Sequence, residues 1–226
     1  MITEFNNRDA IEMFESLSQK DLPFCSEKLT ANGDHSEIDV LFISKYLNRD
    51  SVWLDIGSGS GAIINKINPN DIKKLICVEP IENYAKKIKK AENVEVITAT
   101  FDDFITQNHF DLITAFGVMH YFNSTEAYNV YRHLGSIAKD KCYLIIKNQF
   151  AVKNKVIINN FSNELKMHYF AEYRTVEEEK TMLREAGFDF VDLIDIYPNT
   201  ANRFSNTHFF ALVTKFNSTC REKDMI

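Results

Sequence analysis

The chain has 226 residues, a formal net charge of −6 and a pI near 5.6, and 45% of its residues are hydrophobic. This size and composition favour one globular domain with a buried core, and the acidic balance argues against a surface built to bind nucleic acid. The first nine residues are polar and no run of about 18 apolar residues occurs, so we expect neither an export signal nor a membrane span.

The N-terminal segment, residues 1–35, is predicted to form a lid helix and a loop. Apolar residues recur at roughly helical spacing between residues 8 and 19, and Asn6 or Asn7 is available as the cap. Loop-forming residues follow. A second helical stripe, which includes Leu41, then begins at Ser36 as its expected N-cap and leads into the first strand.

Residues 52–64 read as a strand, a glycine turn and the start of a helix. Val52 to Ile56 is an apolar run of strand length, and Gly57, Gly59 and Gly61 follow at a spacing of two. Glycine lets the backbone approach a ligand closely and adopt positive φ, so the free amides of the turn can face a ligand at the sheet edge. Asp55 would add negative charge near the phosphates of a dinucleotide, but it suits the sulfonium and ammonium groups of S-adenosylmethionine (SAM).

The second strand is predicted over residues 75–78, and it ends on Glu79, followed by Pro80. A carboxylate roughly 20 residues beyond a glycine turn can accept hydrogen bonds from both ribose hydroxyls of an adenosine ligand. Glu79 therefore predicts an adenosine group without choosing between SAM and NAD.

The third and fourth strands are predicted over residues 94–98 and 110–116. The fourth is followed by Gly117-Val118-Met119-His120-Tyr121-Phe122. A helix over 124–137 then packs under the sheet. A fifth strand over 142–146 ends in Lys147-Asn148-Gln149.

The remaining chain completes a seven-stranded pattern. Residues 148–175 form a polar and aromatic insertion, which we expect over the carboxyl edge of the sheet, where it can wall a substrate pocket. A helix over 176–186 is stopped by Gly187. Strands over 188–196 and 208–215 then form a hairpin with a long loop, and residues 217–226 are expected to be a flexible tail.

Two of these blocks carry a family resemblance. The pattern Asp55-x-Gly57-x-Gly59-x-Gly61 resembles the first motif of the class I SAM-dependent methyltransferases. The block from Phe110 to His120 resembles the fourth motif, where a Phe-Asp-apolar strand precedes a short helix with an apolar pair and a histidine. The resemblance implies an α/β fold: a three-layer, Rossmann-like, mostly parallel seven-stranded sheet with an antiparallel last strand, spanning residues 36–216.

The resemblance also implies the cofactor and its contacts. The donor would be S-adenosyl-L-methionine, the product S-adenosyl-L-homocysteine (SAH), and no metal is expected, because no cluster of carboxylates is evident near the acceptor. Thr100 occupies the position where the family commonly has an acidic residue for the adenine, so Phe101 and Asp102 are the candidates there. The expected cofactor residues are Asp55, Gly57, Ser58, Gly59, Gly61, Glu79, Pro80, Phe101, Asp102 and Phe116.

The chemical candidates lie at the carboxyl edge. His120 is the first candidate for a general base, with an ordinary pKa near 6.5, although it can also cap or pack at a helix start. Lys147 and Tyr121 are further catalytic candidates. The expected substrate-binding residues are Asn148, Gln149, Tyr173, Arg174, Arg203 and His208. The two arginines suggest an anionic acceptor, unless Arg203 pins its own loop to the sheet.

The C-terminal part is similar to small bacterial methyltransferases of capsule or surface-polysaccharide modification. This implies O-methylation of an anionic or sugar-type metabolite. The alternatives are N-methylation of a small amine, an NAD-binding oxidoreductase and a non-catalytic SAM-binding protein. The four cysteines form no Cys-x-x-Cys pair, so a cytoplasmic location is expected. We further expect a small-molecule substrate, no nucleic-acid or membrane partner, and a monomer or homodimer.

Overall fold

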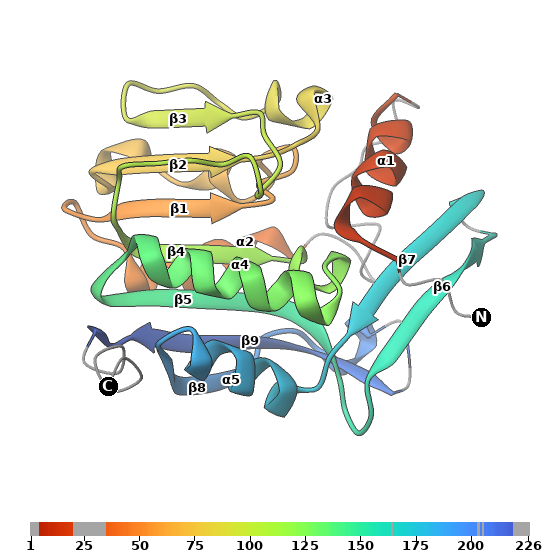
Figure 1. Ribbon diagram of the computed structural model, residues 1–226. Helices are drawn as coiled ribbons and strands as arrows, with labels where there is room; N and C mark the ends of the chain where they lie inside the picture. Colours follow the sequence, from red (N-terminus) through yellow and green to blue (C-terminus); the bar gives the residue numbers. More distant parts are fainter. Residues whose placement is uncertain (1–4, 20–34, 164, 203, 205, 219–226) are drawn as a thin grey trace.

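The computed structural model describes residues 5–19, 35–163, 165–202, 204 and 206–218. Within these residues, seven strands form one sheet in the order β3-β2-β1-β4-β5-β9-β8 (Figure 1). The strands are β1 (Val52–Ile56), β2 (Lys74–Val78), β3 (Val94–Ile97), β4 (Phe110–Phe116), β5 (Ala138–Ala151), β8 (Phe188–Asp195) and β9 (Thr207–Phe216). The first five pair in parallel, and β9 lies antiparallel between β5 and β8. The predicted fold class is confirmed.

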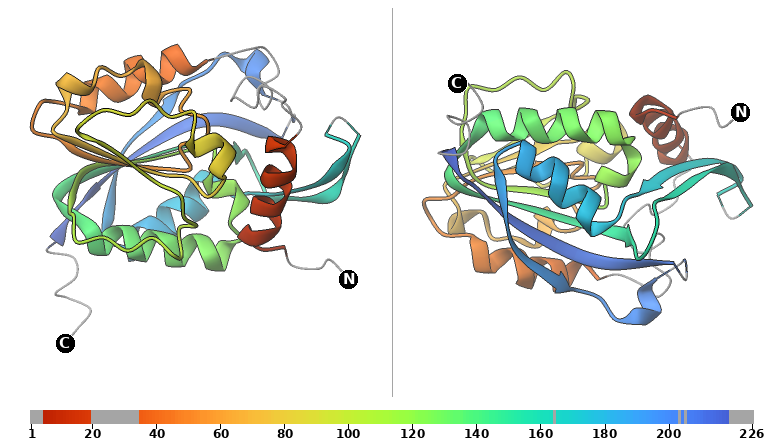
Figure 2. Two further views of the ribbon diagram at one scale, coloured as in Figure 1. Left: turned by 90° about the horizontal axis from the view of Figure 1, so that it is seen from above. Right: turned by 60° about the horizontal axis from the view of Figure 1, so that its bottom comes forward.

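Helices cover both faces of this sheet. Figure 2 shows α4 (Ser124–Ile137) and α5 (Val176–Glu185) on one face and α2 (Ser36–Ile43) on the other. The strands supply both cores because successive side chains point to opposite faces. In β1, Leu54 and Ile56 pack in the core beneath α4, whereas Trp53 packs in the core beneath α2. The sheet is therefore buried on both sides, as a mostly parallel sheet requires.

Local sequence signals set the ends of the two helices on the α4 face. Asn123 and Glu126 form a capping box that starts α4, and the helix has the bounds predicted from sequence. Thr175 and Glu178 form a second capping box that starts α5. Gly187 follows α5 with a φ of 90°, which confirms its predicted role as the residue that stops the helix.

The α2 segment differs from the prediction. His35 occupies the N-cap position, and Ser36 lies inside the helix, where its hydroxyl accepts a hydrogen bond from Lys66. Leu41, expected on the buried stripe, is 71% exposed, while Asp39 is fully buried. The face that carries Asp39 is turned inward, where the carboxylate pairs with a buried lysine on β5, described below, as a buried charge requires a partner.

Other predicted elements change in length. The helix expected after the glycine turn is a 3-10 turn, Ile64–Lys66, and the helix after β2 is the single turn α3 (Glu82–Ala85). The fifth strand is longer than predicted, because β9 pairs with it along residues 143–151. Lys147, Asn148 and Gln149 therefore lie inside β5 and not beyond its end.

The insertion after β5 is a separate hairpin of β6 (Val156–Ser162) and β7 (Met167–Tyr173). It projects beyond the carboxyl edge of the main sheet, and α1 (Asn7–Ser18) lies beside it (Figures 1 and 2). Ala10, Met13 and Leu17 of α1 pack against Tyr121, together with side chains of β7. An Asn6–Asp9 capping box starts the helix, so the predicted N-terminal helix and its cap are present.

Several predictions fall wholly or partly outside the described ranges. These are the loop before residue 35, Arg203 and most of the C-terminal tail. No helix in the described part of the chain is long and apolar enough to cross a membrane.

Candidate active site

A cavity of about 740 Å³ opens at the carboxyl ends of the central strands. Its inner part is lined by the glycine turn after β1 and by the residues that follow β2 and β4. Its outer part is lined by α1, by the 3-10 turn Met119–Tyr121, by the β6–β7 hairpin and by residues between β8 and β9. The carboxyl edge of a parallel sheet is where α/β folds place their ligands.

The glycine turn brings its backbone to the inner end of the cavity, but its amides are not free as expected: those of Gly57 and Ser58 donate to the Val78 carbonyl, and that of Gly59 donates to Glu79. Gly57 has a φ of 67°, and a Cβ at this position would lie 2.8 Å from Val118 Cγ2, so a larger residue would be strained and crowded. Gly59 lines the cavity, and an added Cβ there would meet no described atom within 4 Å. Gly61 does not line the cavity. Its Cβ would clash with Asn65, so Gly61 serves the turn itself.

Asp55 lies buried at the base of the turn. Its carboxylate accepts a hydrogen bond from the Thr114 hydroxyl on the neighbouring strand β4, and that hydroxyl in turn accepts from Trp53 Nε1 at 2.8 Å. This relay fixes the orientation of the carboxylate. Burial raises the pKa of Asp55 to about 6 despite the Thr114 bond, so the ionised form is costly until a positive group lies beside it.

Glu79 is the second buried carboxylate. Its Oε1 accepts from the amide of Ile81 at 2.9 Å and its Oε2 from the amide of Gly59 at 2.8 Å. The side chain therefore links the end of β2 to the glycine turn. Burial raises the pKa of Glu79 to about 7, although these two amides oppose the rise.

Most of the other predicted cofactor residues surround the same inner part. Ser58, Pro80, Phe101 and Phe116 line the cavity. Asp102 is exposed and lies outside the lining.

His120 lines the cavity on the outer side of the glycine turn. It is 7% exposed, and its Nδ1 lies 3.3 Å from Asn148 Oδ1. Burial lowers the pKa of His120 to about 4, so the value near 6.5 expected from sequence does not hold. Since the amide oxygen of Asn148 can only accept, Nδ1 carries the proton, and Nε2 has an available lone pair. Nε2 makes no hydrogen bond within the described residues.

Lys147 is held in a buried triad and does not act alone. Its Nζ lies 2.6 Å from Asp39 Oδ2 and 2.5 Å from the Tyr197 hydroxyl, which also donates to Asp39. The ammonium lies 4.9 Å from the ring centroid of Phe116 and 4.8 Å from that of Tyr197. Lys147 and Tyr197 line the cavity, and the triad ties α2 to β5 and to the residues after β8.

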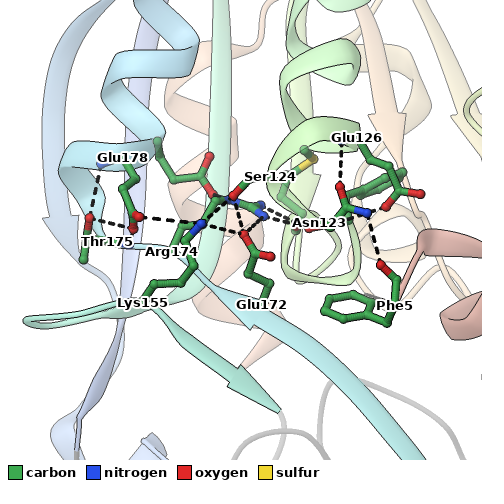
Figure 3. Close-up of polar contacts among 12 residues, drawn as sticks. Phe5, Asn123, Ser124, Glu126, Lys155, Glu172, Arg174, Thr175 and Glu178 are labelled. Carbon is green, nitrogen blue, oxygen red and sulfur yellow. Dashed lines mark hydrogen bonds and ion pairs between the residues drawn. The ribbon is translucent and has the colours of Figure 1, made fainter. Parts of the chain in front are cut away.

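Arg174 is buried, and its guanidinium is hydrogen-bonded to other groups of the protein. Its Nε donates to Glu179 at 2.7 Å, and its two terminal nitrogens donate to the carbonyls of Phe122 and Met119 at 2.7 and 2.6 Å. Figure 3 shows Arg174 beside Glu172, with Lys155 and Ser124 completing the network between the hairpin and α4. It does not line the cavity, so it cannot hold a ligand as the sequence suggested.

The other predicted substrate residues divide into two groups. Gln149 and Tyr173 line the cavity. Asn148 and His208 do not line the cavity. Asn148 accepts a hydrogen bond from His120, which does line it, and His208 pairs with Asp195 and Asn202.

The sequence matches the methyltransferase domain family over residues 37–193, which is more than half of the chain. The chain belongs to this methyltransferase family. The matched residues include the glycine turn, both buried carboxylates and His120. A comparison with curated proteins finds no match.

Solved methyltransferase structures share this fold at low sequence identity. A 1,6-didemethyltoxoflavin-N1-methyltransferase from Burkholderia thailandensis, with bound 1,6-didemethyltoxoflavin and SAH, is 14% identical with a TM-score of 0.70, covering 96% of this chain and 93% of that one. A putative SAM-dependent methyltransferase from Listeria monocytogenes is 12% identical with a TM-score of 0.67, covering 81% and 100%. The N-methyltransferase NodS from Bradyrhizobium japonicum, in complex with SAH, is 17% identical with a TM-score of 0.60, covering 94% and 99%.

Sequence reasoning missed several residues that shape the site of this methyltransferase. Asp39 gave a usable signal, because it is a lone acidic residue within the apolar stretch Ile38-Asp39-Val40-Leu41-Phe42. The β6 strand gave no such signal, because its sequence Val-Ile-Ile-Asn-Asn-Phe-Ser does not alternate in polarity; only in the structure do residues 158, 160 and 162 line the cavity, while Ile157 and Phe161 are 48% and 54% exposed. Thr114 and Tyr197 gave no signal, since only the folded chain brings them to Asp55 and Lys147.

Proposed function

We propose that this methyltransferase binds SAM in the inner part of the cavity and transfers its methyl group to a small-molecule acceptor in the outer part. The observation that carries the proposal is the convergence of the glycine turn, two buried carboxylates and a neutral histidine on one cavity. Bound SAM supplies an activated methyl group, whose carbon–sulfur bond breaks with the electron pair staying on sulfur to give SAH.

The inner residues fit a ligand with positive charge and ribose hydroxyls. The carboxylates of Asp55 and Glu79 are costly when ionised, because burial raises the pKa of both. A sulfonium or ammonium group beside Asp55 would offset that cost, whereas a diphosphate would increase it. Glu79 would accept hydrogen bonds from the ribose hydroxyls, and Phe101, Phe116 and Pro80 offer apolar contacts to the adenine.

The outer residues fit an acceptor that carries a proton on oxygen or nitrogen. With Nδ1 donating to Asn148, the Nε2 lone pair of His120 is available to take that proton as the new bond to the methyl carbon forms. The proton then passes from the imidazolium to water. Because the pKa of His120 is lowered to about 4, the ring is neutral at pH 7 and releases the proton readily, and it is also a weaker base than ordinary imidazole, so it suits an acceptor whose own proton becomes acidic as the methyl bond forms. Lys147 has a positioning role in this proposal, because its ammonium binds the hydroxyl of Tyr197, which lines the cavity.

The residues of the outer part determine which acceptor atom and which class of acceptor the site can take. The expectation of an anionic acceptor rested on Arg174 and Arg203, and that of a sugar-type acceptor on the resemblance of the C-terminal part to surface-polysaccharide methyltransferases. Arg174 is bound by Glu179 and two carbonyls, and Arg203 lies outside the described residues. The proposal therefore covers both O- and N-methylation. Structures that share the fold include N-methyltransferases, such as the B. japonicum protein above.

The test measures methyl transfer and donor binding separately. Wild-type protein and its His120→Ala and His120→Gln variants are incubated with methyl-labelled SAM and a panel of phenols, amines and hydroxy acids, and SAH binding is titrated in parallel. We expect a labelled product with wild type, a loss of about 100-fold or more in the variants, and similar SAH affinity in all three. Binding without transfer to any acceptor would instead indicate a non-catalytic SAM-binding protein, and wild-type turnover in His120→Ala would remove the histidine from the reaction.

A further inference from the structure

We infer that the acceptor of this methyltransferase is a flat, uncharged aromatic or heteroaromatic molecule that carries an O–H or N–H donor. The inference rests on the proposed function, because it assigns the outer part of the same cavity to the acceptor. It is carried by three features of that part: a connected set of aromatic rings, charges that are already paired among the described residues, and two oriented hydrogen-bond acceptors.

Aromatic rings from four separate segments meet around the outer part of the cavity. Phe14 of α1 meets Tyr121 edge to face with ring centroids 4.9 Å apart, and Tyr121 meets Tyr169 of the hairpin at 6.2 Å. On the other side, His120 stacks on Tyr173 at 5.3 Å, and Tyr173 contacts Phe204 at 5.8 Å. All six side chains line the cavity. Such a wall favours a flat π-system over a saturated one, since each ring offers a face or an edge for stacking.

The charges near this wall are already paired. Among the described residues that line the outer part, Lys147 is the charged one, and its ammonium is bound by Asp39 and Tyr197. Arg174 does not line the cavity, and its guanidinium donates hydrogen bonds to Glu179 and to two backbone carbonyls. An anionic ligand would therefore be desolvated without a counter-charge from these residues.

Two polar atoms of the outer part are hydrogen-bond acceptors whose orientation is fixed by their neighbours. Thr207 donates its hydroxyl proton to the Phe204 carbonyl, so its oxygen must accept from Gln149 Nε2, at 2.7 Å. This fixes the orientation of the Gln149 amide and leaves Oε1, which makes no hydrogen bond within the described residues, as an acceptor on a cavity-lining side chain. His120 Nε2 is a second acceptor for the reason given above. A ligand with an O–H or N–H group can donate hydrogen bonds to both.

The hairpin offers a matched pair of positions for the test. Tyr169 lines the cavity from β7, and Phe161 of β6 points to the opposite side with 54% of its surface exposed. Phe161 therefore serves as the control for any loss of aromatic surface that does not involve the cavity. Tyr169→Phe keeps the ring and removes the hydroxyl, and Tyr169→Leu removes the ring.

The experiment titrates SAH-loaded protein with three probes: 2-naphthol, its saturated counterpart 2-decalol, and glucose 1-phosphate. We expect 2-naphthol to bind at least about tenfold more tightly than 2-decalol, and glucose 1-phosphate not to bind. Phe14→Leu and Tyr169→Leu should each weaken 2-naphthol by about three- to tenfold, while Phe161→Leu leaves it unchanged. Tyr169→Phe, which keeps the ring, should weaken it less than Tyr169→Leu. Gln149→Leu should weaken 2-naphthol more than naphthalene, which has no hydroxyl to donate.

The inference is overturned if 2-decalol binds as well as 2-naphthol, if glucose 1-phosphate binds more tightly than either, or if no probe binds the SAH-loaded protein. Equal losses in Tyr169→Leu and Phe161→Leu would also overturn it. SAH affinity measured on every variant separates these outcomes from failure of the proposed function, because a protein that does not bind SAH fails before any probe is added. Thermal melting of each variant shows whether it is folded.

Discussion

The substitution Asp55→Asn tests whether the carboxylate below the glycine turn is kept for a ligand at the expense of stability. Burial raises the pKa of Asp55 from 3.8 to about 6. A carboxyl whose pKa is higher in the folded chain than in the unfolded chain disfavours folding once it must ionise. This cost is absent below about pH 4, grows between pH 4 and 6, and reaches about 3 kcal/mol above pH 6.

Asparagine has the same shape, and its amide oxygen can still accept the hydrogen bond from Thr114. We therefore expect Asp55→Asn to be more stable than wild type by up to about 3 kcal/mol at pH 8, with the difference vanishing near pH 4. SAM affinity should fall in the same variant, because the sulfonium and ammonium groups lose their counter-charge.

Urea unfolding at several pH values measures this difference, and Trp53, the single tryptophan, reports it because its buried indole bonds to Thr114. Asp102→Asn is the matched control, since that carboxylate is exposed and outside the cavity lining. Equal stability of Asp55→Asn and wild type at pH 8 would refute the reasoning, because it would show that the protein already compensates the charge.

Three further predictions concern the donor site, the N-terminal helix α1 and the buried Arg174 network. SAM affinity should rise between about pH 5.5 and 8, since Asp55 and Glu79, with pKa values raised to about 6 and about 7, must lose protons when SAM binds. Calorimetry in buffers of different ionisation enthalpy should detect this proton release. Binding without proton release would contradict the prediction. Glu126→Ala should cost about 1–2 kcal/mol, because Glu126 completes the capping box with Asn123 at the start of α4 (Figure 3). It should also speed hydrogen exchange in α1, because Glu126 accepts from the Asn7 amide; unchanged exchange in residues 7–18 would show that α1 is held by its packing alone. Arg174→Met should cost about 3–5 kcal/mol in urea unfolding, because it leaves Glu179 buried without its partner, and a cost below about 1 kcal/mol would mean that the network is not tightly coupled.

The inner part of the site could be predicted from sequence because its signals are local. The glycine turn, Asp55 and Glu79 follow directly from strands whose apolar runs are clear, and parallel strands bring their carboxyl ends to one edge. The outer part could not be predicted in the same way. Tyr169 and Phe14 meet around the cavity only because a hairpin and an N-terminal helix, far apart in sequence, pack over the same edge.

Polar residues at strand ends were harder to interpret than glycines. Arg174 and Lys147 have the chemistry of ligand-binding cations, but their buried partners Glu179 and Asp39 decide what they do, and neither pairing is visible in the local sequence. His120 lines the cavity, and its pKa depends on how deeply the ring is buried. Burial of individual polar groups is a property of the whole fold.

The central claim is that the glycine turn and Glu79 together hold the adenosyl group of the methyl donor. Calorimetric titration of the full chain with SAH tests it most directly, with Glu79→Gln measured beside the wild type. The account predicts one binding site per wild-type chain and an affinity at least about tenfold lower in the variant, because a charge-assisted acceptor for the ribose hydroxyls is lost. Absence of SAH binding to the wild type, or equal affinity in Glu79→Gln, would contradict it.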